Sequence, residues 1–304
     1  MKRLMINLVL SLMFGMGLSS CEDDRLSESD CFDPEVPTTD VSVHVNLDDE
    51  MKLYRNITSR ASSDYALRYI LKSFMGAKEI GSTVSLSPDM QIKVPAGACR
   101  LAVFVEFVPK ADTSKDYYFF TSQFEELLLR NRVNYQGNDD VKLAFHGVLD
   151  CMIDNKTKQL VMDASPAMGR FRLIPTDKPD YTVGRIEIKY PTDMPAAING
   201  FNGVVCVTWG NVVFVSRAEG EDIGFDNIFA GSKEETVTVT VEIRDTDNTI
   251  RARIKNLKIP IRRGGITNVH LPFYTTLDPG DGEVGSGQGI GIDPSFEGVF
   301  DFEY

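Results

Sequence analysis

Most of the chain alternates apolar and polar residues with a period of two, the pattern of β-strands with one buried face. The clearest case is residues 236–244, where every second position is valine or isoleucine. Turn residues occupy 245–248, and the alternation resumes at Ile250, which predicts a hairpin over residues 236–261. After Ile254 the apolar residues move from even-numbered to odd-numbered positions, a shift of one residue. Because such a slip would otherwise expose the whole apolar set, a bulge is expected near Lys255-Asn256.

Further strands are predicted by the same alternation along the chain. Residues 101–105 are apolar on both faces, which is typical of a central strand. A single short helix is predicted where Ser122 and Glu125 form a capping box ahead of Phe124, Leu127 and Leu128. The remaining predicted strands cover residues 41–47, 67–74, 99–108, 160–164, 170–174, 185–190, 204–209, 212–216 and 267–273.

The best position for a domain boundary is the stretch 163–169, which contains Pro166 and Gly169 and is followed by a new strand. We therefore expect an all-β protein with two tandem β-sandwich domains, residues 41–165 and 166–304. Residues 277–289 have the composition of a linker, and the terminal strand that follows is counted with the second domain.

The first 20 residues have the features of a secretory signal peptide. Lys2 and Arg3 precede an apolar stretch of about 15 residues, which is too short to span a bilayer. The segment Leu18-Ser19-Ser20-Cys21 resembles the lipobox of bacterial lipoproteins, in which the cysteine is acylated and becomes the first residue of the mature chain. This resemblance implies that Cys21 is a lipid anchor.

The next segment, residues 21–40, is acidic, contains proline and is poor in apolar residues, which predicts a lipidated tether. Its first acidic residues, Glu22, Asp23 and Asp24, resemble the export signal that sends Bacteroidetes lipoproteins to the outer face of the outer membrane. A merely solvated linker is the equally weighted alternative. Loss of residues 1–20 removes two positive charges and no acid, which takes the formal net charge from −12 to −14. So acidic a chain disfavours nucleic acid as a partner.

Candidate chemistry is sparse. The four cysteines after Cys21 would permit disulfides in an oxidising compartment, but Cys99 and Cys206 lie in apolar strand-like runs and are expected to be buried free thiols. The histidines are scattered and no Cys-x-x-Cys pair occurs, so we expect no metal site and no cofactor. No Gly-x-Ser-x-Gly elbow is present, and no pair of acids can be nominated for glycoside hydrolysis, so we expect no enzyme.

Two other motifs have ordinary structural interpretations. Residues 262–265, Arg-Arg-Gly-Gly, lie between predicted strands and are expected to form a turn. The glycine-rich run 285–291 has no lysine of a phosphate-binding loop and is predicted to belong to the linker. Trp209, the sole tryptophan, ends an alternating run and is expected to pack in the core.

Five different short structural motifs lie at residues 66–70, 94–97, 169–177, 196–201 and 253–273. Together with the lipobox and the acidic tether, they resemble the fimbrillin-related lipoproteins of Bacteroidales. The resemblance implies two consecutive Greek-key sandwiches of the transthyretin-like type, used as subunits or anchors of cell-surface fimbriae. Stalk subunits of this kind are cleaved after an arginine near the N-terminus, for which Arg55 and Arg60 are the candidates here.

We therefore expect a surface-exposed lipoprotein of the outer membrane, carrying palmitate and other acyl chains on Cys21, that acts in cell adhesion as an anchor, accessory or adhesive subunit of fimbriae. Its partners would be lipid and other fimbrial subunits. The alternative is a glycan-binding surface lipoprotein of a polysaccharide-uptake system. The terminal segment alternates like a strand and is a candidate for closing the chain's own sheet or for donation to a neighbour. Its apolar residues are Phe296, Val299, Phe300, Phe302 and Tyr304.

Overall fold

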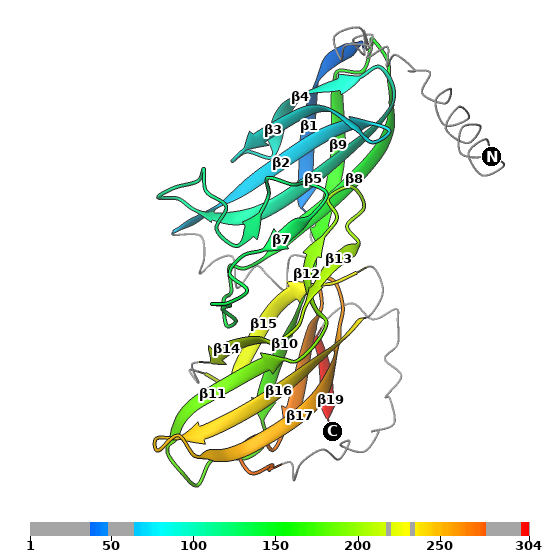
Figure 1. Cartoon of the computed structure of the whole chain (residues 1–304). Helices are drawn as coiled ribbons and strands as arrows, with labels where there is room; N and C mark the ends of the chain where they lie inside the picture. Colours follow the sequence, from blue (N-terminus) through cyan, green and yellow to red (C-terminus); the bar gives the residue numbers. More distant parts are fainter. Residues whose placement is uncertain (1–36, 48–63, 217–219, 232–234, 278–298, 304) are drawn as a thin grey trace, which may run out of the picture. The chain divides into compact units, whose positions relative to one another are not determined.

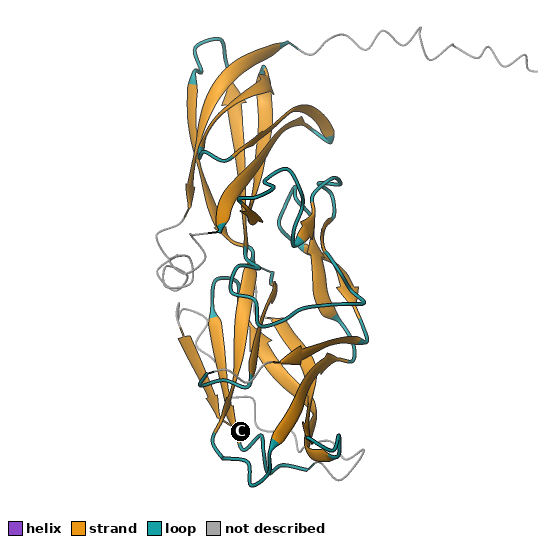
Figure 2. Ribbon diagram, turned by 90° about the vertical axis from the view of Figure 1, so that its left-hand side faces the viewer, coloured by secondary structure: helices purple, strands orange, loops and turns teal. Residues whose placement is uncertain are grey.

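The computed structural model describes residues 37–47, 64–216, 220–231, 235–277 and 299–303. Within these ranges the chain consists of β-strands, turns and loops, and no helix occurs (Figure 2). The all-β prediction is therefore confirmed, and the strands form several sheets in a sandwich-like arrangement. The Greek-key connectivity and the division into two domains remain predictions.

Seven strands before residue 167 build one sheet in the order β3-β2-β5-β8-β9-β1-β4 (Figure 1). Strand β5 lies inside this sheet and pairs with β2 on one side and β8 on the other. Leu101 to Val105 are all fully buried, as the run of apolar residues on both faces predicts. In chain order the strands are β1 (Thr38–Leu47), β2 (Tyr65–Met75), β3 (Lys78–Ser85), β4 (Asp89–Pro95), β5 (Gly97–Pro109), β8 (Ala144–Ile153) and β9 (Gln159–Pro166).

The later part of the chain contributes two four-stranded sheets, β15-β10-β18-β19 and β14-β11-β16-β17. Ala167 alone separates β9 from β10, and it is fully buried. The predicted hairpin is β16 and β17, and the predicted bulge is confirmed. Val239 pairs with Leu257 and Val241 with Ile254, so Lys255 and Asn256 together oppose one residue of β16. The strands are β10 (Met168–Pro175), β11 (Val183–Tyr190), β14 (Val212–Ser216), β15 (Gly224–Phe229), β16 (Glu235–Asp245), β17 (Ile250–Ile261), β18 (Ile266–Leu271) and β19 (Val299–Glu303).

The bulge explains how β17 keeps one face in the core. Asn256 has a left-handed backbone with φ of 55°, a conformation that asparagine tolerates better than most residues. The extra residue restores the parity, so that Ile254 and Leu257 are both buried.

A further sheet, β13-β12-β7-β6, takes strands from both sides of residue 167. Its central pairing joins Leu128 of β7 to Ala197 of β12. Strands from before and after residue 167 are thereby hydrogen-bonded in one sheet. The strands are β6 (Phe119–Phe120), β7 (Leu127–Leu129), β12 (Met194–Ile198) and β13 (Val205–Trp209).

This sheet shows why the predicted helix beginning at Ser122 is wrong. The residues after Ser122 form a turn in which the Glu126 N–H donates to the Gln123 carbonyl, and β7 follows directly. The Phe124 carbonyl accepts a hydrogen bond from the Gly200 N–H at 2.8 Å. A Cβ atom on Gly200 would lie 2.3 Å from that carbonyl oxygen, so only glycine permits the approach. A local capping signal is overridden here by pairing with a distant strand.

Two side chains can be compared directly with their predicted environments. Trp209 is 8% exposed and packs in the core, as expected. Cys206, expected to be buried, is exposed instead. Side chains alternate between the two faces of a strand, so Trp209 and Cys206 project from opposite faces of β13. Only the face that holds Trp209 points inward. The predicted turn at 262–265 is present, and Gly264 has φ of 71°.

A buried polar cluster is centred on Asp226 of β15, which is fully buried. Lys142 donates to its Oδ1 atom at 2.5 Å, and the hydroxyls of Tyr135 and Tyr190 donate to Oδ2 at 2.9 and 2.7 Å. The Asn227 N–H also donates to Oδ1, at 2.8 Å. The carboxylate is thus saturated with donors that come from β11, β15 and the segment between β7 and β8.

Glu106 of β5 forms a second buried polar contact and carries a pH prediction. Its carboxylate accepts from Arg68 at 2.5 Å, while Arg68 also pairs with Asp116. Burial, opposed by Arg68, raises the pKa of Glu106 from 4.5 to about 7. The folded state therefore holds an extra proton between these two values. Stability is expected to fall as pH rises through this window and to level off above it.

The Glu106→Gln variant is expected to lose this part of the pH dependence, because its amide does not titrate. Melting temperatures of both proteins, measured in steps from about pH 5 to about pH 8, test this expectation. An unchanged slope in the variant would show that Glu106 does not titrate in this range.

Candidate functional site

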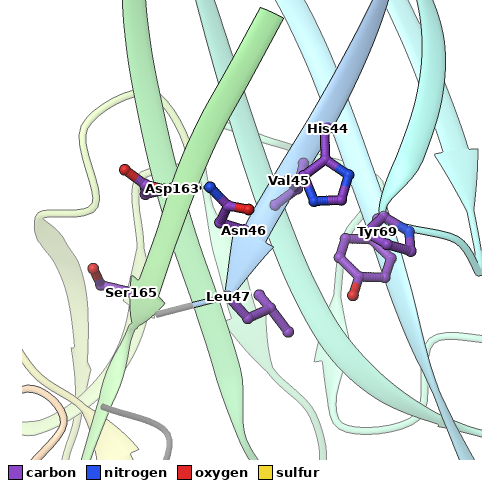
Figure 3. A pocket seen from close by; sticks show the side chains of 8 residues that line it. His44, Val45, Asn46, Leu47, Tyr69, Asp163 and Ser165 are labelled. Carbon is purple, nitrogen blue, oxygen red and sulfur yellow. Dashed lines mark hydrogen bonds between the residues drawn. The ribbon is translucent and has the colours of Figure 1, made fainter. Parts of the chain in front are cut away.

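A pocket of about 840 Å³ lies where β1 ends, beside β9 and β2. Figure 3 shows Asp163 and Ser165 on one side of β1 and Tyr69 on the other. Strand β1 supplies half of the lining because four consecutive residues contribute to it. The lining residues are His44, Val45, Asn46, Leu47, Tyr69, Pro88, Asp163 and Ser165.

Strand register brings the polar side chains of the pocket together. His44 and Asn46 both project from the outer face of β1, since they alternate with the buried Val43 and Val45. His44 lies directly opposite Asp89 of β4, and its Nδ1 atom is 2.7 Å from Asp89 Oδ1.

Strand register also forms a second polar pair of the pocket, on the other side of β1. Asn46 lies directly opposite Asp163 of the parallel strand β9, and its amide donates to Asp163 Oδ1 at 3.0 Å. Each side chain is therefore held by a partner from a neighbouring strand.

The chemistry of the lining suits a neutral ligand rich in hydroxyl groups. An asparagine amide has two N–H donors and a carbonyl acceptor, so the bond to Asp163 leaves further capacity on Asn46. Asp163 and Ser165 add acceptors and a hydroxyl on the same side. Tyr69 is 5% exposed, and burial raises the pKa of its hydroxyl, which therefore remains protonated.

The sequence did not single out these pocket residues. The alternation of β1 places His44 and Asn46 outward, but their partners lie 45 and 117 residues away, and only the sheet order identifies them.

The site residues that the sequence predicts do not line this pocket. Cys21, the acidic residues 22–24, Arg55 and Arg60 lie outside the described residues, as do Phe296, Tyr304 and the glycine-rich run 285–291. The other three members of the terminal segment, Val299, Phe300 and Phe302, belong to β19. This strand pairs in parallel with β18 of the same chain, from Ile266↔Val299 to His270↔Glu303.

No group of three or more histidine, cysteine, aspartate or glutamate residues in the described ranges is arranged to hold a metal ion. In the same ranges, no helix has the length and apolar character needed to cross a membrane.

Several solved structures share features with this chain at low similarity. A protein from Bacteroides ovatus, provisionally described as an adhesin, is 12% identical, with a TM-score of 0.46 over 74% of this chain and 78% of that one. The fimbrial anchor protein Mfa2 from Porphyromonas gingivalis is 10% identical, with a TM-score of 0.45 over 72% of this chain and 82% of that one. The tip fimbrial protein Mfa3 from the same organism, with a C-terminal truncation, is 9% identical, with a TM-score of 0.40 over 73% and 81%.

The comparison with curated proteins gave no significant match. What the structure defines is an all-β protein of sandwich-like sheets with a polar surface pocket. The chain belongs to the family of unknown function DUF6562, whose model matches residues 34–301.

Proposed function

We propose that the protein is a lipid-anchored, non-catalytic subunit of the bacterial cell surface, acting as a fimbrial anchor or as an accessory or adhesive subunit of fimbriae. The observation that carries this proposal is the lipobox at Cys21 behind a basic and apolar start. In this proposal, residues 1–20 are removed as a signal peptide, and residues 21–40 tether the folded part to the outer membrane. The acidic residues 22–24 direct the protein to the outer face. The all-β fold supports the proposal, since sheet edges can accept strands from partner subunits.

The anchor leads to a direct prediction. Cys21→Ala is expected to abolish acylation and to move the protein out of the outer-membrane fraction, because several acyl chains hold a protein firmly and a bare chain has none. Fractionation combined with metabolic labelling by a fatty acid measures both effects, and Cys31→Ala is the matched control. A variant that stays in the membrane fraction, with no label on the wild-type protein, would refute the lipobox interpretation.

The terminal strand leads to a second prediction. Removal of residues 295–304 takes β19 away from β18 and is expected to lower the melting temperature if the strand serves its own sheet. If the strand is donated to a neighbour, the truncated protein keeps its melting temperature and loses the fimbrial subunits with which the full chain co-purifies. A truncation that changes neither property would exclude both roles.

A glycan-binding surface lipoprotein of a polysaccharide-uptake system is the second candidate, and the pocket at the end of β1 favours it. Trp209 does not provide an exposed stacking platform, because it is buried. In this second candidate function, the glycan is bound by the hydroxyl-binding groups around Asn46.

Binding to a glycan array tests this candidate. Asn46→Ala is expected to abolish binding, whereas Gln159→Ala, an exposed amide on β9 outside the pocket, should leave it unchanged. Fimbriae captured by the protein without any glycan binding would favour the first function.

A further inference from the structure

Two cysteines face each other on adjacent inner strands of the seven-stranded sheet. Cys99 of β5 is directly opposite Cys151 of the antiparallel strand β8. Directly opposed residues of an antiparallel pair project to the same face. Both cysteines are free, so this pairing places the two thiols side by side on one face of the sheet.

The strand geometry is close to that of a disulfide. Opposed residues in antiparallel strands have Cβ atoms about 4.5–5.5 Å apart, and a disulfide has them about 3.5–4.5 Å apart. An approach of about 1 Å is therefore enough to form the bond.

The neighbouring pair holds the two strands in this register. Arg100 lies opposite Asp150, and the Arg100 Nε atom donates to Asp150 Oδ1 at 2.7 Å while Nη2 donates to Oδ2 at 2.8 Å. A bidentate contact of this kind fixes the orientation of both partners. A slip of β8 along β5 would break this contact together with the continuous pairing from Gly97↔Ile153 to Glu106↔Ala144, so the thiols stay opposite each other.

We propose that Cys99 and Cys151 form a reversible cross-strand disulfide between β5 and β8. The oxidant is a disulfide compound, either glutathione disulfide or the disulfide of a thiol oxidoreductase, which is reduced to two thiols as the protein dithiol loses two electrons and two protons. The Cys151 thiolate first attacks the oxidant, forms a mixed disulfide and releases one thiol. Cys99 then attacks the Cys151 sulfur, and the second thiol leaves.

The order of these steps follows from accessibility. Cys151 is half-buried and Cys99 is 5% exposed, so the oxidant reaches Cys151 first. Burial, reinforced by the neighbouring Cys151 thiol, raises the pKa of Cys99 to about 12.

Formation in the cell depends on the export that the proposed function includes, but formation in the purified protein does not. The reduced full chain is incubated with glutathione disulfide, alkylated, denatured and digested without reduction. The expected result is a single cross-linked pair of peptides containing Cys99 and Cys151, with a mass lower by two hydrogens than the sum of the two thiol forms.

Matched variants make the result decisive. Cys151→Ser should abolish the cross-link, whereas Cys206→Ser, at an exposed position on β13, should leave it intact. The wild-type protein should melt at a lower temperature after reduction, and Cys151→Ser should show no such difference. Alkylation of Cys99 as a free thiol after equilibration, or its pairing with Cys31 or Cys206, would overturn the proposal. Failure of Cys21 to be acylated would leave this result untouched.

Discussion

Asp226→Ala is expected to lower the free energy of unfolding by ~3–5 kcal/mol, because it leaves the Lys142 ammonium buried without its counter-charge. The Lys142 and Asp226 side chains are 5% and 0% exposed, so solvent cannot replace the lost partner. The hydroxyls of Tyr135 and Tyr190 would lose the same acceptor. Urea unfolding followed by fluorescence measures the change.

The control for this prediction is the same substitution at an exposed ion pair. Asp150 is paired with Arg100, and their side chains are 65% and 41% exposed. Asp150→Ala is therefore expected to cost no more than about 1 kcal/mol. If the two variants were equally stable, the buried cluster would contribute no more than a surface pair.

Val239→Asp is the second substitution with a large expected effect. Val239 is fully buried in β16, so an aspartate there must either bury an unpaired charge or take up a proton, at a cost of several kcal/mol. Thr240→Asp, on the other face of the same strand and opposite Lys189, should change stability by no more than about 1 kcal/mol. Melting curves of the two variants make the comparison. Equal shifts would mean that the two faces of β16 do not differ in burial.

Local patterns predicted the features that depend on neighbouring residues. The β16–β17 hairpin and its bulge follow from apolar parity, which a single strand reveals by itself. The buried centre of β5 follows from a run of apolar residues for the same reason. Strand β4 is absent from the predicted strands, although Met90, Ile92 and Val94 alternate as a strand with one buried face does.

Features that depend on distant pairing could not be predicted in this way. The segment after Ser122 has a helical capping signal, but Leu127 and Leu128 pair with β12. The pocket has the same limitation, because no local pattern identifies Asp89 and Asp163 as the partners of β1.

The sheet built from β6, β7, β12 and β13 also has a consequence for the order of folding. Strand β7 ends at Leu129, but its partner β12 begins only at Met194. Pairing across such a separation must first overcome the entropy of closing a long loop, which slows the search for the native topology. A chain that emerges from a translocation channel N-terminus first would therefore leave one edge of β7 open until β12 had arrived. During that interval the open edge offers its N–H and C=O groups to any other extended chain, so release and folding of the complete chain must be fast relative to collisions.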